Sequence, residues 1–428
     1  MSSLGRSGKP YRPKWSPEER FKPWSYRALT VIDVFLHVFV VSTFVIIIWR
    51  GSYELFVHYH KASYPWLAIV FCIVVQLILS FTGNPLIRYF NKPHKSRIAF
   101  LITSRAFIYA HFMTGLIVYV YQEQLLDTTI LHFNLHEIVS ETTATLVAIG
   151  ILCMCRMVAV IMTPPACGLS FDPKPEEIFQ FETMFRAQKS NTGYSCLYVL
   201  DSFFSVCIIG TLVVVVWRGV WAIMDKYLYP EQEQMSAWLS LVIGYSVVLV
   251  AFSLQYWVKN LVRRIKGIKR IIVVDIYLLF SFFGAVNVWR GIWNMLDVYF
   301  LPEAQVTSYW ISHIACFIIL VALNSSNSIL VRGVYMDGEG DGTQCVDFPC
   351  YYVRLLVQKR KRKKNNVVEK EDKEMIQVKG NLEEEEEIEQ SVMGKLLTNS
   401  VIKENGDIKA NKNGENIKTI VQYDNNIV

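Results

Sequence analysis

The feature that most constrains this sequence is a series of apolar blocks, each about 17–24 residues long. A helix rises ~1.5 Å per residue, so a block of this length can cross the ~30 Å hydrocarbon core of a bilayer. Hydrophobic residues make up 52% of the 428 residues and charged residues only 19%, and the apolar residues are grouped rather than spread as in a soluble core. The blocks predict transmembrane helices at residues 31–49, 66–82, 98–121, 143–163, 194–217, 236–257, 271–289 and 310–331.

The fold class that these blocks predict is all-α: a polytopic bundle of about eight transmembrane helices, built from repeated two-helix hairpins. A transmembrane β-barrel would instead show segments of about ten residues with alternating polarity. The third and fourth blocks contain Arg105, His111 and Arg156, so a six-span chain is the alternative interpretation. Because about thirty polar and basic residues precede the first block, we expect no cleavable signal peptide.

The distribution of Lys and Arg predicts the orientation of the chain. Twenty of these cations lie before the first block and in the loops after blocks two, four and six, whereas the alternate loops contain five. Loops rich in Lys and Arg stay in the cytoplasm. We therefore expect both termini on the cytosolic side of the membrane, with lipid as the main surrounding partner.

The segments outside the blocks define the domain organisation. We expect a cytosolic basic arm at residues 1–30, a transmembrane domain at 31–335 and a disordered cytosolic tail at 336–428, since the tail has little contiguous apolar surface. The basic run Lys359–Lys364 is a candidate for binding anionic inner-leaflet lipids, or is an ordinary solvated flank. Cys345 and Cys350, just past the last block, are candidates for palmitoylation, or are reduced cytosolic thiols.

A repeated motif is the most distinctive pattern in the sequence. The tripeptide Trp-Arg-Gly occurs three times, as Trp49-Arg50-Gly51, Trp217-Arg218-Gly219 and Trp289-Arg290-Gly291. The last two copies extend further than the tripeptide and share 8 of 15 positions. These shared positions include Trp221 and Trp293, and also Asp225 and Asp297. The spacing indicates a two-span hairpin used about four times, with copies related by an axis along the membrane normal.

Two interpretations of the motif stay open. Tryptophan prefers the headgroup level, and an arginine on the last turn of a helix faces the negative end of the helix dipole and can reach lipid phosphates. On this view the motif is an aromatic belt with arginines that extend to the interface. The alternative is a specifically packed rim at the outer end of the bundle, which three copies in register favour.

The two long copies, together with Asp33, Asp201 and Asp275 at 16, 16 and 14 residues before each Trp, resemble the Fuseless family of invertebrate multi-pass membrane proteins. The resemblance covers roughly residues 24–335. It implies a plasma-membrane protein of neurons that is associated with the presynaptic terminal and with transmitter release. It also implies protein partners at the synapse. The resemblance brings no catalytic residues with it.

Ionisable residues inside the predicted spans are candidate functional residues, because charge in a bilayer is costly. Arg105, Arg156 and Asp201 each lie about seven residues from the inner boundary, or ~10 Å deep. We expect Asp201 to pair with one of these two arginines, whereas Asp33 and Asp275 lie nearer the interface. A structural ion pair is the plainer interpretation of these charges.

The sequence contains no P-loop, GxSxG, HExxH or paired CxxC motif, so we expect no enzyme activity, no cofactor and no metal site. It is also not basic enough to suggest binding to nucleic acid. Two functions remain. The first, which the family resemblance implies, is a non-enzymatic presynaptic protein that supports or organises release. The second is a secondary transporter or channel for an unknown solute, a class that intramembrane charges and parallel repeats also fit.

Overall fold

The computed structural model of the chain describes residues 23–60, 64–92, 96–131, 137–167, 175–179, 199–200, 203–330, 337, 342–343, 345–348, 350 and 352–409. Two compact units are separated at residue 356, with unit 1 at residues 1–356 and unit 2 at residues 357–428. The described residues form helices and connecting turns, and no strand occurs among them.

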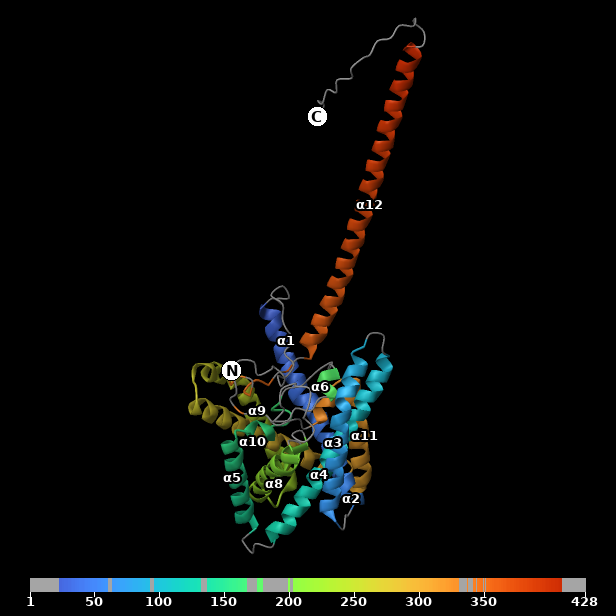
Figure 1. The fold of residues 1–428 in the computed structure, drawn as a ribbon. Helices are drawn as coiled ribbons and strands as arrows, with labels where there is room; N and C mark the ends of the chain where they lie inside the picture. Colours follow the sequence, from blue (N-terminus) through green and yellow to red (C-terminus); the bar gives the residue numbers. More distant parts are fainter. Residues whose placement is uncertain are drawn as a thin grey trace. The chain divides into compact units, whose positions relative to one another are not determined.

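The helices of unit 1 follow the predicted blocks in order (Figure 1). They are α1 (Pro23–Phe35), α2 (Ser42–Tyr59), α3 (Pro65–Phe90), α4 (Arg97–Leu131), α5 (Glu137–Cys155), the short α6 (Pro175–Phe179), α8 (Gly210–Tyr227), α9 (Glu233–Arg264), α10 (Ile268–Tyr299) and α11 (Gln305–Ala322). Within the described residues, 7 helices are long and apolar enough to cross a membrane, and α5 is a shorter apolar helix in the position of the predicted fourth span. The predicted all-α polytopic bundle is confirmed.

The hairpins are arranged as a closed ring. The first helices of the four hairpins, α2, α4, α8 and α10, form the inner ring, because each contacts the next and α10 contacts α2. The second helices pack mainly on the inner helix of the neighbouring hairpin rather than on that of their own. Thus α3 packs on α4, α5 on α8, α9 on α10 and α11 on α2. Each hairpin therefore joins two quarters of the ring.

The motif glycines allow the close approach of inner and outer helices. A Cβ atom placed on Gly51 would lie 2.7 Å from the Tyr309 carbonyl oxygen of α11, and one on Gly291 would lie 2.8 Å from the Leu241 backbone nitrogen of α9. Real Cβ atoms do not make such contacts, so a side chain at either position would push the two helices apart. The glycine of the motif is therefore explained by helix packing.

The outer helices carry the lipid-facing surface. Large apolar side chains such as Phe71 of α3, Met154 of α5, Trp257 of α9 and Ile318 of α11 are 61–78% exposed to the surroundings of the chain. By contrast, α10 lies inside and is the most buried of the spanning helices. A surface this apolar is stable in lipid rather than in water.

The two halves of unit 1 repeat the same backbone irregularities at one constant sequence offset. A π-helical turn, Leu36–Val41, precedes α2, and a second, Phe204–Ile209, precedes α8. Similarly, Arg156 after α5 and Asn324 after α11 both adopt left-handed backbone conformations, with φ of 59° and 54°. Leu36 and Phe204 are as far apart in the sequence as Arg156 and Asn324. Because a π-helical turn is uncommon, this agreement indicates that two hairpins together form one repeat.

The segment after the last span differs from the predicted disordered tail. The side chains of Asp337, Val346 and Arg354 are 0–4% exposed within unit 1. Arg354 forms an ion pair with Asp33, 2.5 Å from its Nε to Oδ2. The sequence prediction failed here because the segment itself has low hydrophobicity. The sequence does not show that a buried charge of the bundle, such as Asp33, bonds the polar side chains of this segment.

Residues 353–409 also differ from the prediction, since they form one helix, α12 (Val353–Lys409). Unit 2 contains most of it. Glu, Lys and Gln are good helix formers, and the stretch has no proline. Oppositely charged side chains three and four residues apart stabilise an exposed helix without any core. The stretch lacks an apolar stripe, which is why the sequence alone predicts disorder here.

Candidate functional site: a central cavity inside the ring

Ion pairs between successive copies of the motif link the inner ring. Arg290 of the last copy bonds Asp225 of the preceding one, 2.7 Å from Nε to Oδ1. Arg218 in turn bonds Asp127 at 2.6 Å, on the inner helix α4. The first and last copies are joined by Arg50, whose Nη2 lies 2.6 Å from Asp297. In each pair the aspartate lies eight residues past an aromatic residue of its own helix. These aromatic residues are Trp217 for Asp225, Tyr119 for Asp127 and Trp289 for Asp297.

Small polar residues on the outer helices complete the partners of two arginines. Ser236 and Ser240 of α9 accept hydrogen bonds from Arg290. Ser308 and Ser312 of α11 accept hydrogen bonds from Arg50, at 3.3 and 3.4 Å. The two pairs of serines are separated in the sequence by the same interval as the last two copies of the motif. In the third quarter the outer helix contributes Glu141, whose carboxylate lies 2.9 Å from Arg218.

Within the described part of α2, α3 and α4, the fourth quarter of the ring has no ion pair of this kind. Val120 stands in place of the motif arginine on α4, and Val57 stands in place of the motif aspartate on α2. Both belong to one apolar cluster, which also includes Ala68 in the place of Ser236 of α9 and Ser308 of α11. The three positions that are polar in other quarters are therefore all apolar in this one. Three quarters of the ring contain an ion pair and the fourth is apolar.

The motif arginines do not reach out to lipid phosphates. Arg50 is 0% exposed and Arg290 is 2% exposed. Each inner helix that carries the motif continues for nine residues beyond its arginine, to Tyr59, Tyr227 or Tyr299. The expectation that each motif arginine lies on the last turn of its helix is therefore wrong. The helix can continue past the arginine because side chains of other hairpins neutralise it. The alternative, a packed rim, agrees with these contacts.

The motif tryptophans form an aromatic layer inside the ring. The Trp289 ring lies 5.4 Å from that of Trp217 and 6.0 Å from that of Trp49, edge to face. Tyr119 of α4 extends the layer and lies 6.3 Å from Trp49. Each indole N–H donates to a backbone carbonyl in the segments that follow α5 and α11. These acceptors are Ile329 for Trp49, Ile161 for Trp217 and Pro164 for Trp289.

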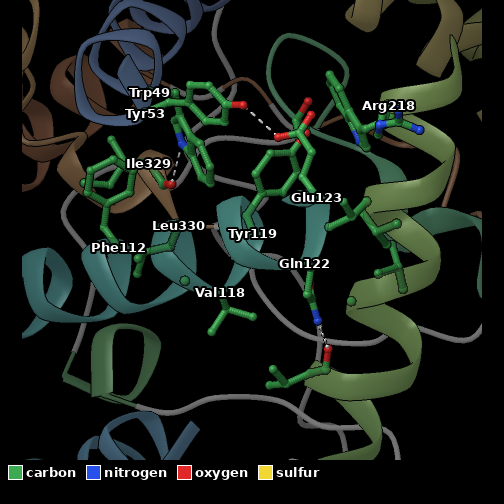
Figure 2. A pocket seen from close by; sticks show the side chains of 18 of the residues that line it. Trp49, Tyr53, Phe112, Val118, Tyr119, Gln122, Glu123, Arg218, Ile329 and Leu330 are labelled. Atoms are coloured by element: carbon green, nitrogen blue, oxygen red, sulfur yellow. Dashed lines mark hydrogen bonds between the residues drawn. The ribbon is translucent and has the colours of Figure 1, made fainter. Parts of the chain in front are cut away.

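Next to this layer is a cavity of about 590 Å³, within the size range of small-molecule sites. Figure 2 shows part of its lining, with Trp49, Tyr53, Tyr119 and Glu123 directed towards one another. Two of the dashed lines mark the hydrogen bond from the Tyr53 hydroxyl to Glu123, at 2.8 Å, and that from Trp49 to the Ile329 carbonyl. All four inner helices contribute to the lining.

A second layer lies one helical turn beyond the first. Four residues after each motif aromatic, the inner helices carry Tyr53, Glu123, Trp221 and Trp293, all of which line the cavity. Trp293 lies 5.4 Å from Tyr53 and 5.7 Å from Trp221 between ring centroids. Three aromatic rings and one carboxylate therefore occupy equivalent positions around the ring.

The carboxylates that line the cavity differ in whether an arginine lies beside them. Asp225 is paired with Arg290, and Glu141 is paired with Arg218. The ion pairs among the described residues do not include Glu54 or Glu123, which both line the cavity. Glu123 accepts a hydrogen bond from Tyr53, and Glu54 accepts one from Trp293. The cavity thus has more carboxylates than cations.

Those of the predicted intramembrane charges that the structure describes do not line the cavity, and they fall into separate groups. Asp33 is 0% exposed, pairs with Arg354, and accepts a hydrogen bond from the backbone N–H of Tyr352 at 3.1 Å. Arg105 donates a hydrogen bond to the side chain of Asn324. Asp201 lies outside the described residues, so its pairing with Arg105 or Arg156 stays a prediction.

A third group joins Asp275, Arg156 and Asp337. The Arg156 side chain donates to the backbone carbonyl of Asp337 at 3.2 Å. The Asp337 carboxylate accepts the backbone N–H groups of Val158 and Ala159, at 2.5 and 3.0 Å. It is also hydrogen-bonded to Asp275, and burial raises the pKa of Asp337. A hydrogen bond between two carboxyl groups requires that one of them keeps its proton.

The sequence interpretation identified the motif tryptophans, and Tyr53 in place of the second Trp of the first copy, but missed Glu54, Tyr119 and Glu123. A signal for the third hairpin was present, because Asp127 follows Tyr119 by the same eight residues that separate Trp217 from Asp225. It was overlooked since Val120 replaces the arginine. Glu54 gave no signal of its own, because a carboxylate past the predicted end of a span is read as a loop residue.

The comparisons with known proteins find one family. The family model named Fuseless matches residues 28–330, which is most of the chain and contains every helix of the ring. Neither a curated protein nor a solved structure matches the chain. The match covers the four hairpins and ends at Leu330, before the buried segment that contains Asp337 and Arg354.

Proposed function

The chain belongs to the Fuseless family, and we propose on that premise that it is a non-enzymatic plasma-membrane protein of the presynaptic terminal that supports or organises neurotransmitter release. The family match over residues 28–330 carries this proposal. Both termini lie in the cytosol, as the bias of Lys and Arg favours. The helix α12 then offers a long cytosolic surface for protein partners.

Evoked transmitter release in neurons that lack the protein is the direct test of this role. We expect the evoked response to fall while the response to directly applied transmitter is unchanged, and the full chain to restore release. A chain that ends at Leu356 tests the cytosolic surface, because it keeps unit 1 and removes unit 2. Normal evoked release without the protein would refute the proposed role.

Epitope tags test the orientation separately. Tags after Gly5 and after Lys412 should be detected only in permeabilised cells, and a tag after His132 should be detected on intact cells. The tag at His132 lies past Asp127, so the ion pair with Arg218 is kept. A C-terminal tag that is accessible on intact cells would overturn both the orientation and the even number of spans.

A secondary transporter or channel is the second candidate, and the central cavity favours it. A cavity of about 590 Å³ with carboxylates inside a membrane domain is suited to a solute. Uptake into proteoliposomes made with the purified chain tests this candidate. Saturable, gradient-driven uptake that Glu123→Gln abolishes would favour transport. Absence of uptake by a folded chain would count against transport and leave the presynaptic role as the proposed function.

A further inference from the structure

We propose that the central cavity binds a small organic cation, with a quaternary ammonium group or a protonated amine held between aromatic rings and two carboxylates. The residues that carry this proposal line the cavity and come from all four inner helices. They are Tyr53, Glu54, Glu123, Trp221 and Trp293. The inference uses the same cavity as the transport candidate but requires only binding, and it does not depend on the presynaptic role.

The arrangement of the aromatic rings is the first argument. Tyr53, Trp293 and Trp221 form a continuous series with centroid distances of 5.4 and 5.7 Å, and the layer of Trp49 and Trp289 lies one turn away. The face of an aromatic ring attracts a cation through its quadrupole, most strongly for Trp and where water is excluded. Several rings that surround one volume are the usual means of holding a quaternary ammonium group.

The position of Glu123 is the second argument. It occupies on α4 the place that an aromatic residue takes on α2, α8 and α10. The carboxylate is held by the Tyr53 hydroxyl at 2.8 Å, from the adjacent ring of the series (Figure 2). A ring of three aromatic side chains closed by one carboxylate provides both the π faces and the counter-charge that a cation needs.

The charge of the cavity is the third argument. The cations Arg218 and Arg290 are bonded to Asp127, Glu141 and Asp225, and Arg50 is bonded to Asp297. Glu54 and Glu123 form no part of these ion pairs. An anionic solute would meet two carboxylates here, and like charges at close range in a site of low dielectric repel strongly. A cation would instead neutralise the site.

Binding to the purified full-length chain in lipid nanodiscs tests the proposal. Choline is the probe, and 3,3-dimethylbutanol is its uncharged control of nearly the same shape. Titration calorimetry and quenching of tryptophan fluorescence measure the affinity. We expect saturable binding of choline and at least about tenfold weaker binding of the uncharged control, since the control lacks the charge that the rings and carboxylates recognise.

Matched variants locate the site. Glu123→Gln and Trp221→Leu should each weaken choline binding by about tenfold, because each removes one charge or one π face. The controls are Glu231→Gln in an exposed turn and Trp257→Leu on the outer face of α9, both away from the cavity. They should bind choline like the natural chain. A size-exclusion profile equal to that of the natural chain shows that each variant is folded.

Three results would overturn the proposal. The first is the absence of saturable choline binding by the folded chain. The second is equal affinity for choline and 3,3-dimethylbutanol, and the third is unchanged affinity in Glu123→Gln and Trp221→Leu. Because binding is measured without a gradient, choline binding with no uptake into proteoliposomes would support this inference and count against transport alone.

Discussion

Arg50 and Asp297 lie 247 residues apart in the chain, and the arginine donates two hydrogen bonds to one carboxylate oxygen, at 2.9 Å from Nε and 2.6 Å from Nη2. This contact joins the first hairpin to the last and closes the ring. Arg50 is fully buried, whereas the Asp297 side chain is 36% exposed. Burial of an unpaired guanidinium is costly. The contact therefore stabilises one closed arrangement of the four hairpins.

The ion pair of Arg290 and Asp225 should behave as a unit. Asp225→Leu leaves Arg290 buried without its carboxylate. We expect a loss of about 1–3 kcal/mol of stability and lower surface expression, because the Asp225 side chain is half exposed and Ser236 and Ser240 still accept from Arg290. The double variant Arg290→Leu with Asp225→Leu should recover much of that loss, since no charge is then stranded. Thermal unfolding in nanodiscs measures both, with Lys226→Ala at an exposed neighbouring position as the control. A double variant no more stable than Asp225→Leu would contradict the assignment.

The apolar quarter of the ring should tolerate an introduced charge only when the opposite charge is introduced with it. Val120→Arg alone places a charge in the cluster of Phe56, Leu116 and Tyr121, and we expect it to destabilise the chain by several kcal/mol, about 3–5. Adding Val57→Asp supplies the carboxylate at the position that the other quarters use. The melting temperature should then rise above that of the single variant. If the double variant melts lower still, the four quarters are not equivalent.

Gly291 should tolerate no large side chain. In Gly291→Leu the added atoms would meet Leu241, whose backbone nitrogen is 2.8 Å from the position of a Cβ. We expect the contact of α10 with α9 to open and the folded yield to fall sharply. Gly150→Leu on α5 is the matched control, because no atom lies within 4 Å of its Cβ position. Yield and monodispersity on size exclusion measure the difference, and equal yields would refute the packing argument.

Stability should depend on pH through Asp337. Burial raises the pKa of this carboxyl above its ordinary value of 3.8, so the folded chain keeps a proton that the unfolded chain releases. The stability that this proton gives is complete below about pH 3.8 and is lost as the pH rises through the raised pKa, at roughly 1.4 kcal/mol for each unit of pKa difference.

In Asp337→Asn that part of the pH dependence should disappear. The backbone N–H groups of Val158 and Ala159 bond different oxygens of the Asp337 carboxylate, so one of them loses its acceptor and the variant should be less stable at every pH. Melting temperatures from about pH 4 upward test this, with Glu231→Gln as the exposed control. The same slope in Asp337→Asn and in the natural chain would show that Asp337 does not titrate in this range.

The sequence by itself determined the all-α membrane fold, the order of the spans and the hairpin repeat. The physical reason is that lipid imposes a simple requirement, about twenty apolar residues per helix, which can be read one segment at a time. The ends of the inner helices could not be read in this way. Polar residues such as Arg50, Glu54 and Asp297 look like loop residues until another hairpin is known to bury them.

Tertiary structure alone decided which copies meet. The sequence shows that Arg290 and Asp297 belong to one motif, but Arg290 bonds Asp225 and Asp297 bonds Arg50. An arginine and an aspartate seven residues apart lie on the same helix with their side chains two turns apart, so they cannot bond each other. Ring closure brings each beside a neighbouring copy. The cavity, with Glu123 facing Tyr53, exists only because of that closure.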